Sequence, residues 1–210
     1  MRLFWVLIII FASSSGSFAQ NRYEVVGDTL VFDTNHSAVG FENTGQLEDY
    51  DVNLLADYIF EHPEIKTLKL TSRGGFIPAS RSIATILMEH AIDTVAYDKC
   101  YSACTLIFLA GKSRTLEVGG ELGFHRQIVV KEDHKPYFEA NQEEMGWDDE
   151  FAYFSYSYDD LTDNLVKDIK YMSSRGLPLD FILKAFSISS GDMWVPTREE
   201  LLGAKVITAY

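Results

Sequence analysis

Hydrophobic residues recur along this chain with two different periods, and segments of the two kinds follow one another. Apolar residues at every second position indicate a β-strand, whereas apolar residues three and four apart indicate one face of a helix. The alternation from residue 23 to 33 is interrupted by Gly27-Asp28, which predicts a hairpin of two short strands. The same criteria predict helices over 47–61, 77–90 and 102–110, and strands over 67–71 and 93–97.

Two of these predicted strands lead directly into a turn and then into a helix. Gly74-Gly75 follows the strand over 67–71, and Ser102 follows the strand over 93–97. Repeated strand, helix, strand order predicts βαβ units and an α/β fold with a mostly parallel sheet flanked by helices. Ligands bind beyond the carboxyl ends of the strands in such sheets. We therefore expect the glycine pair and Ser102 to lie at the same edge of the sheet.

The second half of the chain has a less regular pattern. The polar segment 127–136 is typical of a loop, and the acidic, aromatic segment 137–172 predicts one or two helices. Further helices are predicted over 179–186 and 197–202, and short strands over 193–195 and 206–208. Because no internal repeat or low-complexity linker is evident, we expect one domain over 20–210.

The first 19 residues have the pattern of a cleavable secretory signal. Arg2 precedes the apolar run 3–12, and a small-residue exit site ends at Ala19. The run is shorter than the ~20 apolar residues of a membrane span. We therefore predict a periplasmic or secreted protein. The alternative is an uncleaved membrane anchor, and membrane contact is expected only in that case.

The charge of the chain excludes one class of partner. The formal net charge is −13, and no basic stripe offsets it, so nucleic-acid binding is not expected. The acidic cluster over 143–150 lacks the ligand spacing and turn glycine of a calcium loop. His125 and His134 have no evident third metal ligand. We therefore expect neither a metal nor a cofactor.

The only two cysteines lie close to Ser102. Cys100 and Cys104 are four residues apart, a separation that one helical turn can bring within bridging range. In an exported protein this spacing is compatible with a disulfide, which would shape the turn around Ser102. Two buried free thiols are the alternative.

Three elements provide the residue types that acyl transfer requires. Ser102 is the candidate nucleophile, and His125 is the candidate general base. The backbone N–H groups of Gly74, Gly75 and Ala103 are candidate oxyanion donors. Each element also has an ordinary structural interpretation: a helix cap for the serine, a turn for the glycines, and a packed side chain for the histidine.

The combination resembles the Clp protease/crotonase superfamily, and more narrowly a group of exported bacterial Clp-like proteins of uncharacterised function. The resemblance rests on Ser72-Arg73-Gly74-Gly75, on Ser102-Ala103-Cys104, on Gly123-Phe124-His125 and on the tail 192–207. It implies a spiral of βαβ units, a serine peptidase site and assembly into a homo-oligomer. The crotonase branch binds coenzyme A thioesters, which an exported protein does not normally meet.

The chain departs from this family at the acidic residue that orients the histidine. The corresponding position falls in 187–190, which has no carboxylate, and Asp192 is the nearest acid. The sequence therefore predicts a serine hydrolase that cleaves peptides or other acyl substrates through the pair Ser102 and His125. Asp192 is the candidate third residue; a Ser–His dyad without an acid, or a serine hydroxyl of 187–190 that orients the ring, are the alternatives. The alternative is a catalytically inactive Clp-like binding or assembly protein.

Overall fold

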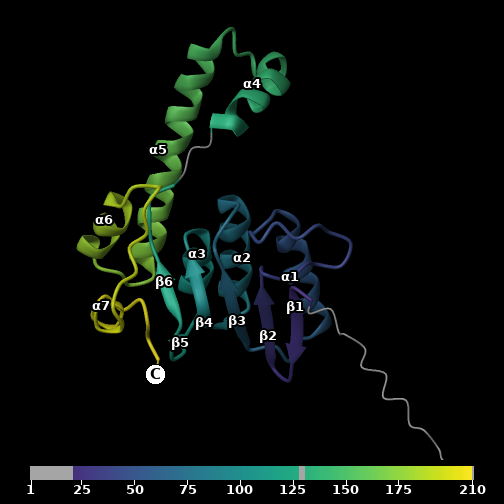
Figure 1. Cartoon of the computed structure of the whole chain (residues 1–210), viewed down its shortest axis with the longest axis vertical. Helices are drawn as coiled ribbons and strands as arrows, with labels where there is room; N and C mark the ends of the chain where they lie inside the picture. Colours follow the sequence, from purple (N-terminus) through teal and green to yellow (C-terminus); the bar gives the residue numbers. More distant parts are fainter. Residues whose placement is uncertain (1–20, 128–130, 210) are drawn as a thin grey trace, which may run out of the picture.

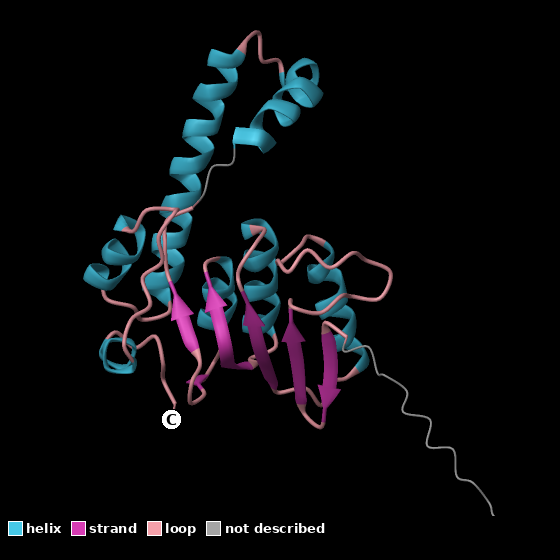
Figure 2. Ribbon diagram, viewed as in Figure 1, coloured by secondary structure: helices cyan, strands magenta, loops and turns pink. Residues whose placement is uncertain are grey.

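A computed structural model shows a six-stranded, mostly parallel sheet flanked by helices, as the sequence predicts (Figures 1 and 2). It describes residues 21–127 and 131–209, so the predicted signal segment lies outside the described residues. The strands are β1 (Tyr23–Val26), β2 (Thr29–Asp33), β3 (Thr67–Ser72), β4 (Asp93–Tyr101), β5 (Arg114–Leu116) and β6 (Glu121–Gly123). Strands β1 to β5 lie in sequence order, and only the β1–β2 pair is antiparallel. The long strand β4 pairs with β5 through its first half and with β6 through its second.

Three helices pack side by side against one face of the sheet (Figure 2). They are α1 (Tyr50–Glu61), α2 (Ile77–Glu89) and α3 (Ala103–Leu109). Helices α1 and α2 bury one apolar face each, whereas all seven residues of α3 are buried. An apolar helix without a polar face is expected where neighbouring elements surround it, as the sequence of α3 predicts. The core therefore lies between these helices and the sheet, and α3 packs against β4 within it.

Helix α1 begins three residues later than predicted. Leu47 is paired instead with Gly75 in an isolated parallel bridge. The Leu47 N–H donates to the Gly74 carbonyl at 2.8 Å, and the Phe76 N–H donates to the Leu47 carbonyl at 2.8 Å. This tertiary pairing competes with the helical hydrogen bonds of the 47–49 segment, and it holds the glycine turn from the side.

The loop predicted over 127–136 is wrong from residue 131 onward. Helix α4 (Lys131–Met145) begins there and contains Pro136, and Gly146 separates it from α5 (Glu150–Ser174). Aromatic packing stabilises this helical hairpin, because the Trp147 ring lies 4.8 Å from Tyr153 and 5.0 Å from Tyr156. The hairpin projects away from the sheet as an arm (Figure 1).

The carboxyl-terminal segment packs against the edge of the sheet that carries β5 and β6. Helices α6 (Leu179–Ser187) and α7 (Arg198–Gly203) are present close to the predicted positions, and Thr197 caps α7 in a capping box. The strand predicted over 193–195 is reduced to a single bridge between Trp194 and Phe124. The strand predicted over 206–208 is wrong, and a single bridge joins the following residue, Ala209, to Thr115. Too few neighbouring residues are in register for a ladder at either place.

Candidate active site

Ser102 lies at an abrupt junction between strand and helix. Strand β4 ends at Tyr101 and α3 begins at Ala103, so Ser102 alone makes the turn. Its backbone has φ 54° and ψ −126°, a conformation that residues with a side chain rarely adopt. Hydrogen bonds on both sides hold it there: the Ser102 N–H donates to the Gly123 carbonyl at 2.8 Å, and the Thr105 hydroxyl donates to the Ser102 carbonyl at 2.7 Å.

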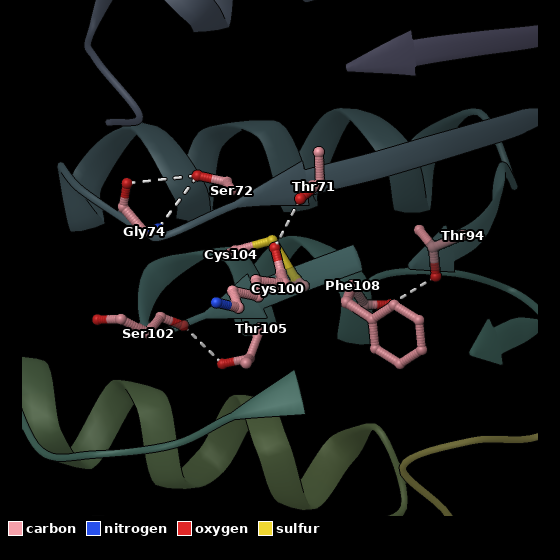
Figure 3. The surroundings of a disulfide bond; sticks show 10 residues. Thr71, Ser72, Gly74, Thr94, Cys100, Ser102, Cys104, Thr105 and Phe108 are labelled. Atoms are coloured by element: carbon pink, nitrogen blue, oxygen red, sulfur yellow. Dashed lines mark hydrogen bonds between the residues drawn. A yellow bond between two sulfur atoms is a disulfide. The ribbon is translucent and has the colours of Figure 1, made fainter. Parts of the chain in front are cut away.

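The Ser102 side chain does not cap α3. It makes no capping hydrogen bond to the helix, and no hydrogen bond of its Oγ is found within the described part of the chain. In Figure 3 the hydroxyl points away from the neighbouring disulfide. Helix caps are normally explained by the bond from their oxygen to an N–H of the first turn. The structure therefore removes the capping interpretation and leaves a partly exposed hydroxyl on a strained turn, a geometry in which hydrolases present a nucleophile.

The glycine turn packs directly against Ser102. A Cβ atom placed on Gly74 would lie 2.8 Å from the Ser102 Cβ and 3.2 Å from the Ala103 nitrogen. A Cβ atom on Gly75 would lie 2.5 Å from the Leu47 nitrogen. Both glycines have positive φ, 100° and 142°. Only glycine therefore allows the β3 turn to approach the β4 turn this closely.

The three candidate oxyanion donors are not equivalent. The Gly74 N–H donates to the Ser72 hydroxyl at 3.1 Å, which fixes the turn but occupies that donor. Within the described residues, the N–H groups of Gly75 and Ala103 have no acceptor. Ala103 is the first residue of α3, where a free N–H is expected. The two free donors therefore belong to the two turns that the glycines bring together.

His125 follows β6 and is held by the backbone on both sides. Phe124 exchanges backbone hydrogen bonds of 2.9 and 3.0 Å with Trp194, and the Arg126 N–H donates to the Ile188 carbonyl at 3.1 Å. The imidazole is half-buried, and its Nδ1 atom is buried without a hydrogen-bond partner among the described residues. Burial lowers the pKa of the His125 imidazole below 6.5, so the neutral, proton-accepting form predominates near neutral pH.

Ser102, Ala103 and His125 line the same small cavity. Its volume is about 40 Å³, enough for one or two small groups. The Ser102 Oγ and the His125 ring are not hydrogen-bonded to each other. The remaining lining comes from α2, α3, α5, α6 and the segment after β6, and is mostly apolar. These residues are Ile77, Thr105, Leu106, Phe124, Gln127, Asp168, Met172, Ala185 and Phe186.

The acid nearest to the expected position does not line this cavity. Asp192 is exposed, in the turn that precedes Trp194, and its backbone N–H donates to the Ser189 carbonyl at 3.0 Å. A carboxylate that the sequence analysis did not single out lines the cavity instead: Asp168 of α5, which is 4% exposed. The sequence feature that could have identified Asp168 is its place on the apolar face of the predicted helix, next to Ile169 and four residues before Met172.

Cys100 and Cys104 form a disulfide around the candidate nucleophile (Figure 3). Their Cα atoms are 5.2 Å apart, and both residues are fully buried. The bond joins the end of β4 to the first turn of α3 and therefore closes a loop that contains Ser102. No group of three or more potential metal ligands is found among the described residues.

Comparison with known proteins gives a likeness in structure only. No protein-family model and no curated protein matches the chain. A solved structure of a ClpP1 mutant from Listeria monocytogenes is similar, with a TM-score of 0.59 and 11% sequence identity. The match covers 86% of this chain and 89% of that chain. At this identity the comparison establishes the architecture and not the chemistry, and we conclude that the chain has a Clp-like fold.

Proposed function

We propose that this protein is a serine hydrolase that acts on peptides or other acyl substrates. The observation that carries the proposal is the environment of Ser102. A strained turn presents a hydroxyl that is not used as a cap, and it lies in one cavity with a half-buried histidine. The N–H groups of Ala103 and of Gly75 in the adjoining glycine turn have no acceptor among the described residues. Backbone strain of this kind clusters at active sites, which supports a functional role for Ser102.

The proposed reaction is acyl transfer in two steps. The Ser102 Oγ attacks the substrate carbonyl carbon while His125 accepts the hydroxyl proton. The carbonyl oxygen becomes an oxyanion that accepts hydrogen bonds from the Gly75 and Ala103 N–H groups. His125 then returns the proton to the leaving group, and the acyl-enzyme forms. In the second step His125 accepts a proton from a water molecule, whose oxygen attacks the acyl carbon. His125 then returns the proton to the Ser102 Oγ as the acyl–oxygen bond breaks, which releases the acid product and regenerates Ser102.

The absence of a hydrogen bond between the Ser102 and His125 side chains does not contradict this mechanism. Hydrogen bonds between a catalytic serine and its base are often absent in the free enzyme and form in the substrate complex. Both side chains face one cavity, and Ser102 has no competing hydrogen bond among the described residues. Rotation about the Ser102 Cα–Cβ bond is therefore not opposed by the loss of another interaction.

The size of the cavity indicates which substrates should react first. A volume of about 40 Å³ with a mostly apolar lining favours a small, uncharged acyl group. The test is hydrolysis of p-nitrophenyl acetate, butyrate and octanoate by the oxidised protein. We expect the acetate to react fastest. Ser102→Ala should abolish this turnover and His125→Ala should reduce it about 100-fold or more. Ser82→Ala, at an exposed position of α2 that does not line the cavity, is the matched control. Equal turnover by wild type and Ser102→Ala is incompatible with the proposal.

The second candidate is a catalytically inactive Clp-like binding or assembly protein. The absence of a hydrogen bond between Ser102 and His125 and the exposure of Asp192 favour it. The same assay separates the two. A protein that folds, retains its disulfide and shows no Ser102-dependent hydrolysis supports the binding function.

We also propose that the protein is exported and self-associates. The buried disulfide supports export, because disulfides persist in oxidising compartments. Exposed apolar side chains on α5, including Phe151 at 82% and Phe154 at 67%, support burial of the arm against another copy. No helix in the described part of the chain has the length and apolar character of a membrane span. Light scattering of wild type and of the double variant Phe151→Ser/Phe154→Ser tests self-association, and only wild type should be oligomeric.

A further inference from the structure

Asp168 is the one acidic residue that lines the cavity of Ser102 and His125 in the described part of the chain. Its side chain is 5% exposed, on the last third of α5. A carboxylate buried to this extent costs free energy unless it is paired and hydrogen-bonded. Its presence beside the candidate site therefore needs a reason.

Two side chains from different elements satisfy the Asp168 carboxylate. The Arg81 Nε of α2 donates to Oδ1 at 2.9 Å, and the Gln127 Nε2 donates to Oδ2 at 3.0 Å. Arg81 is itself fixed, because its Nη1 donates to the Asn164 Oδ1 at 2.7 Å. Asp168 therefore connects α5 both to the helix that follows the glycine turn and to the segment that carries His125.

Gln127 connects this carboxylate to the candidate base. It lies two residues after His125, and both side chains line the cavity. The backbone between them is held at Arg126 by the Ile188 carbonyl. A hydrogen bond that fixes the Gln127 side chain therefore also restrains the segment that carries His125, and Asp168 lines the same cavity as the imidazole.

We propose that Asp168 is the positioning residue for His125 and acts through Gln127, in place of the acid that the family resemblance leads us to expect near Asp192. The catalytic consequence rests on the proposed hydrolase function, whereas the electrostatic consequence does not. Asp168 fixes the His125 segment and places a negative charge in the wall of the cavity that the imidazole also lines. Carboxylates that lie behind a catalytic or metal-binding histidine commonly orient its ring.

The other charged groups near His125 determine the sign of the effect. The residues of α3 and α6 that line the cavity are uncharged. Arg81 on α2 faces Asp168, and Arg126 on the histidine's own segment is exposed. Replacing Asp168 with asparagine therefore removes the negative charge and leaves the Arg81 guanidinium uncompensated. Both changes disfavour the imidazolium, so the pKa of His125 must fall.

The experiment is an NMR titration of the histidine ring signals of the full, oxidised chain. The His125 signal is identified by its loss in His125→Gln. We expect Asp168→Asn to lower the pKa of His125 by roughly 0.5 unit or more. Asp51→Asn is the matched control, because it removes the same charge from a buried pair with Arg22, whose Nη1 lies 2.8 Å from the Asp51 carboxylate. It should destabilise the fold without moving the pKa of His125.

Kinetics with p-nitrophenyl acetate tests the positioning role separately. Gln127→Leu keeps the carboxylate and removes its link, so we expect kcat to fall roughly tenfold or more with KM nearly unchanged. Asp168→Glu should restore part of the kcat that Asp168→Asn loses. An unshifted His125 pKa in Asp168→Asn overturns the proposal, as does an unchanged kcat in Gln127→Leu.

If wild type lacks turnover, the hydrolase proposal fails, and the titration alone decides whether Asp168 controls His125. If Asp168→Asn does not fold, the titration of Gln127→Leu decides. The His125 ring signal must shift or broaden in this variant if Gln127 positions the histidine, and an unchanged signal overturns the proposal.

Discussion

Replacing Ser102 with glycine should stabilise the fold, although it removes the proposed nucleophile. The Ser102 backbone, at φ 54° and ψ −126°, lies where a side chain costs about 1–3 kcal/mol. Glycine adopts this conformation without that cost. The Ser102 Oγ has no hydrogen bond among the described residues, so its removal should cost little unfolding free energy. The hydroxyl group would then be retained at the expense of stability, as expected for a functional residue.

The magnitude follows from a comparison of two variants. Ser102→Ala and Ser102→Gly both lose the hydroxyl, but only alanine keeps the strain. Glycine loses about 0.5–1 kcal/mol more conformational entropy on folding than alanine. Relief of about 1–3 kcal/mol of strain exceeds this loss, so Ser102→Gly should exceed Ser102→Ala in unfolding free energy by about 1 kcal/mol.

Urea unfolding of the oxidised variants, followed by tryptophan fluorescence, measures this difference. The midpoint should rise from Ser102→Ala to Ser102→Gly while the m-value stays constant. Ala91→Gly is the matched control, because Ala91 has φ 53° in the turn after α2, away from the cavity. If Ala91→Gly is stabilised and Ser102→Gly is no more stable than Ser102→Ala, the strain argument for Ser102 is wrong.

Three further predictions concern the same site. Cys100→Ser/Cys104→Ser should lose about 2 kcal/mol of unfolding free energy, the chain-entropy value for so short a loop, and hydrolysis should slow; equal rates with and without reductant would contradict this. Gly75→Ala should lose roughly 3 kcal/mol or more of unfolding free energy, because φ is 142° and the added Cβ would lie 2.5 Å from the Leu47 backbone nitrogen. Gly119→Ala is the control: φ is 85°, the added Cβ meets no atom within 4 Å, and the loss in the same urea experiment should be smaller. Because burial lowers the pKa of His125, the hydrolysis rate should fall in acid with a midpoint below pH 6.5, and a midpoint above pH 6.5 refutes the assignment of His125 as the base. The contribution of neutral His125 to the unfolding free energy should be complete above pH 6.5 and be lost as the pH falls through its lowered pKa.

The local sequence pattern was sufficient to predict the framework of the site. Strands β3 and β4 show clear period-two alternation, and each ends in a turn that the sequence identifies, Gly74-Gly75 and Ser102. Parallel register then brings the two turns together, because Ser72 lies opposite Cys100 across the sheet. The juxtaposition of the glycine turn with Ser102 therefore follows from short-range signals and one topological rule.

The features that the sequence did not reveal all depend on long-range contacts. The bridge between Leu47 and Gly75 overrides the helical pattern of its own segment. Asp168 acquires its position through Arg81, which is 87 residues away in the chain. Helix α4 forms despite Pro136, since its aromatic residues pack against α5. Hydrophobic periodicity reports the face that a segment buries, but not the distant partner that it meets.

Covalent labelling with a fluorophosphonate tests the central claim most directly. The reagent forms a phosphorus–oxygen bond with an activated serine and releases fluoride, so it reports the reactivity of Ser102 without a known substrate. Peptide mapping of the labelled, oxidised protein should find one adduct, on Ser102, that forms about 100-fold more slowly in His125→Ala. No adduct on Ser102 in the folded protein, or an adduct that forms equally fast without His125, would contradict the account.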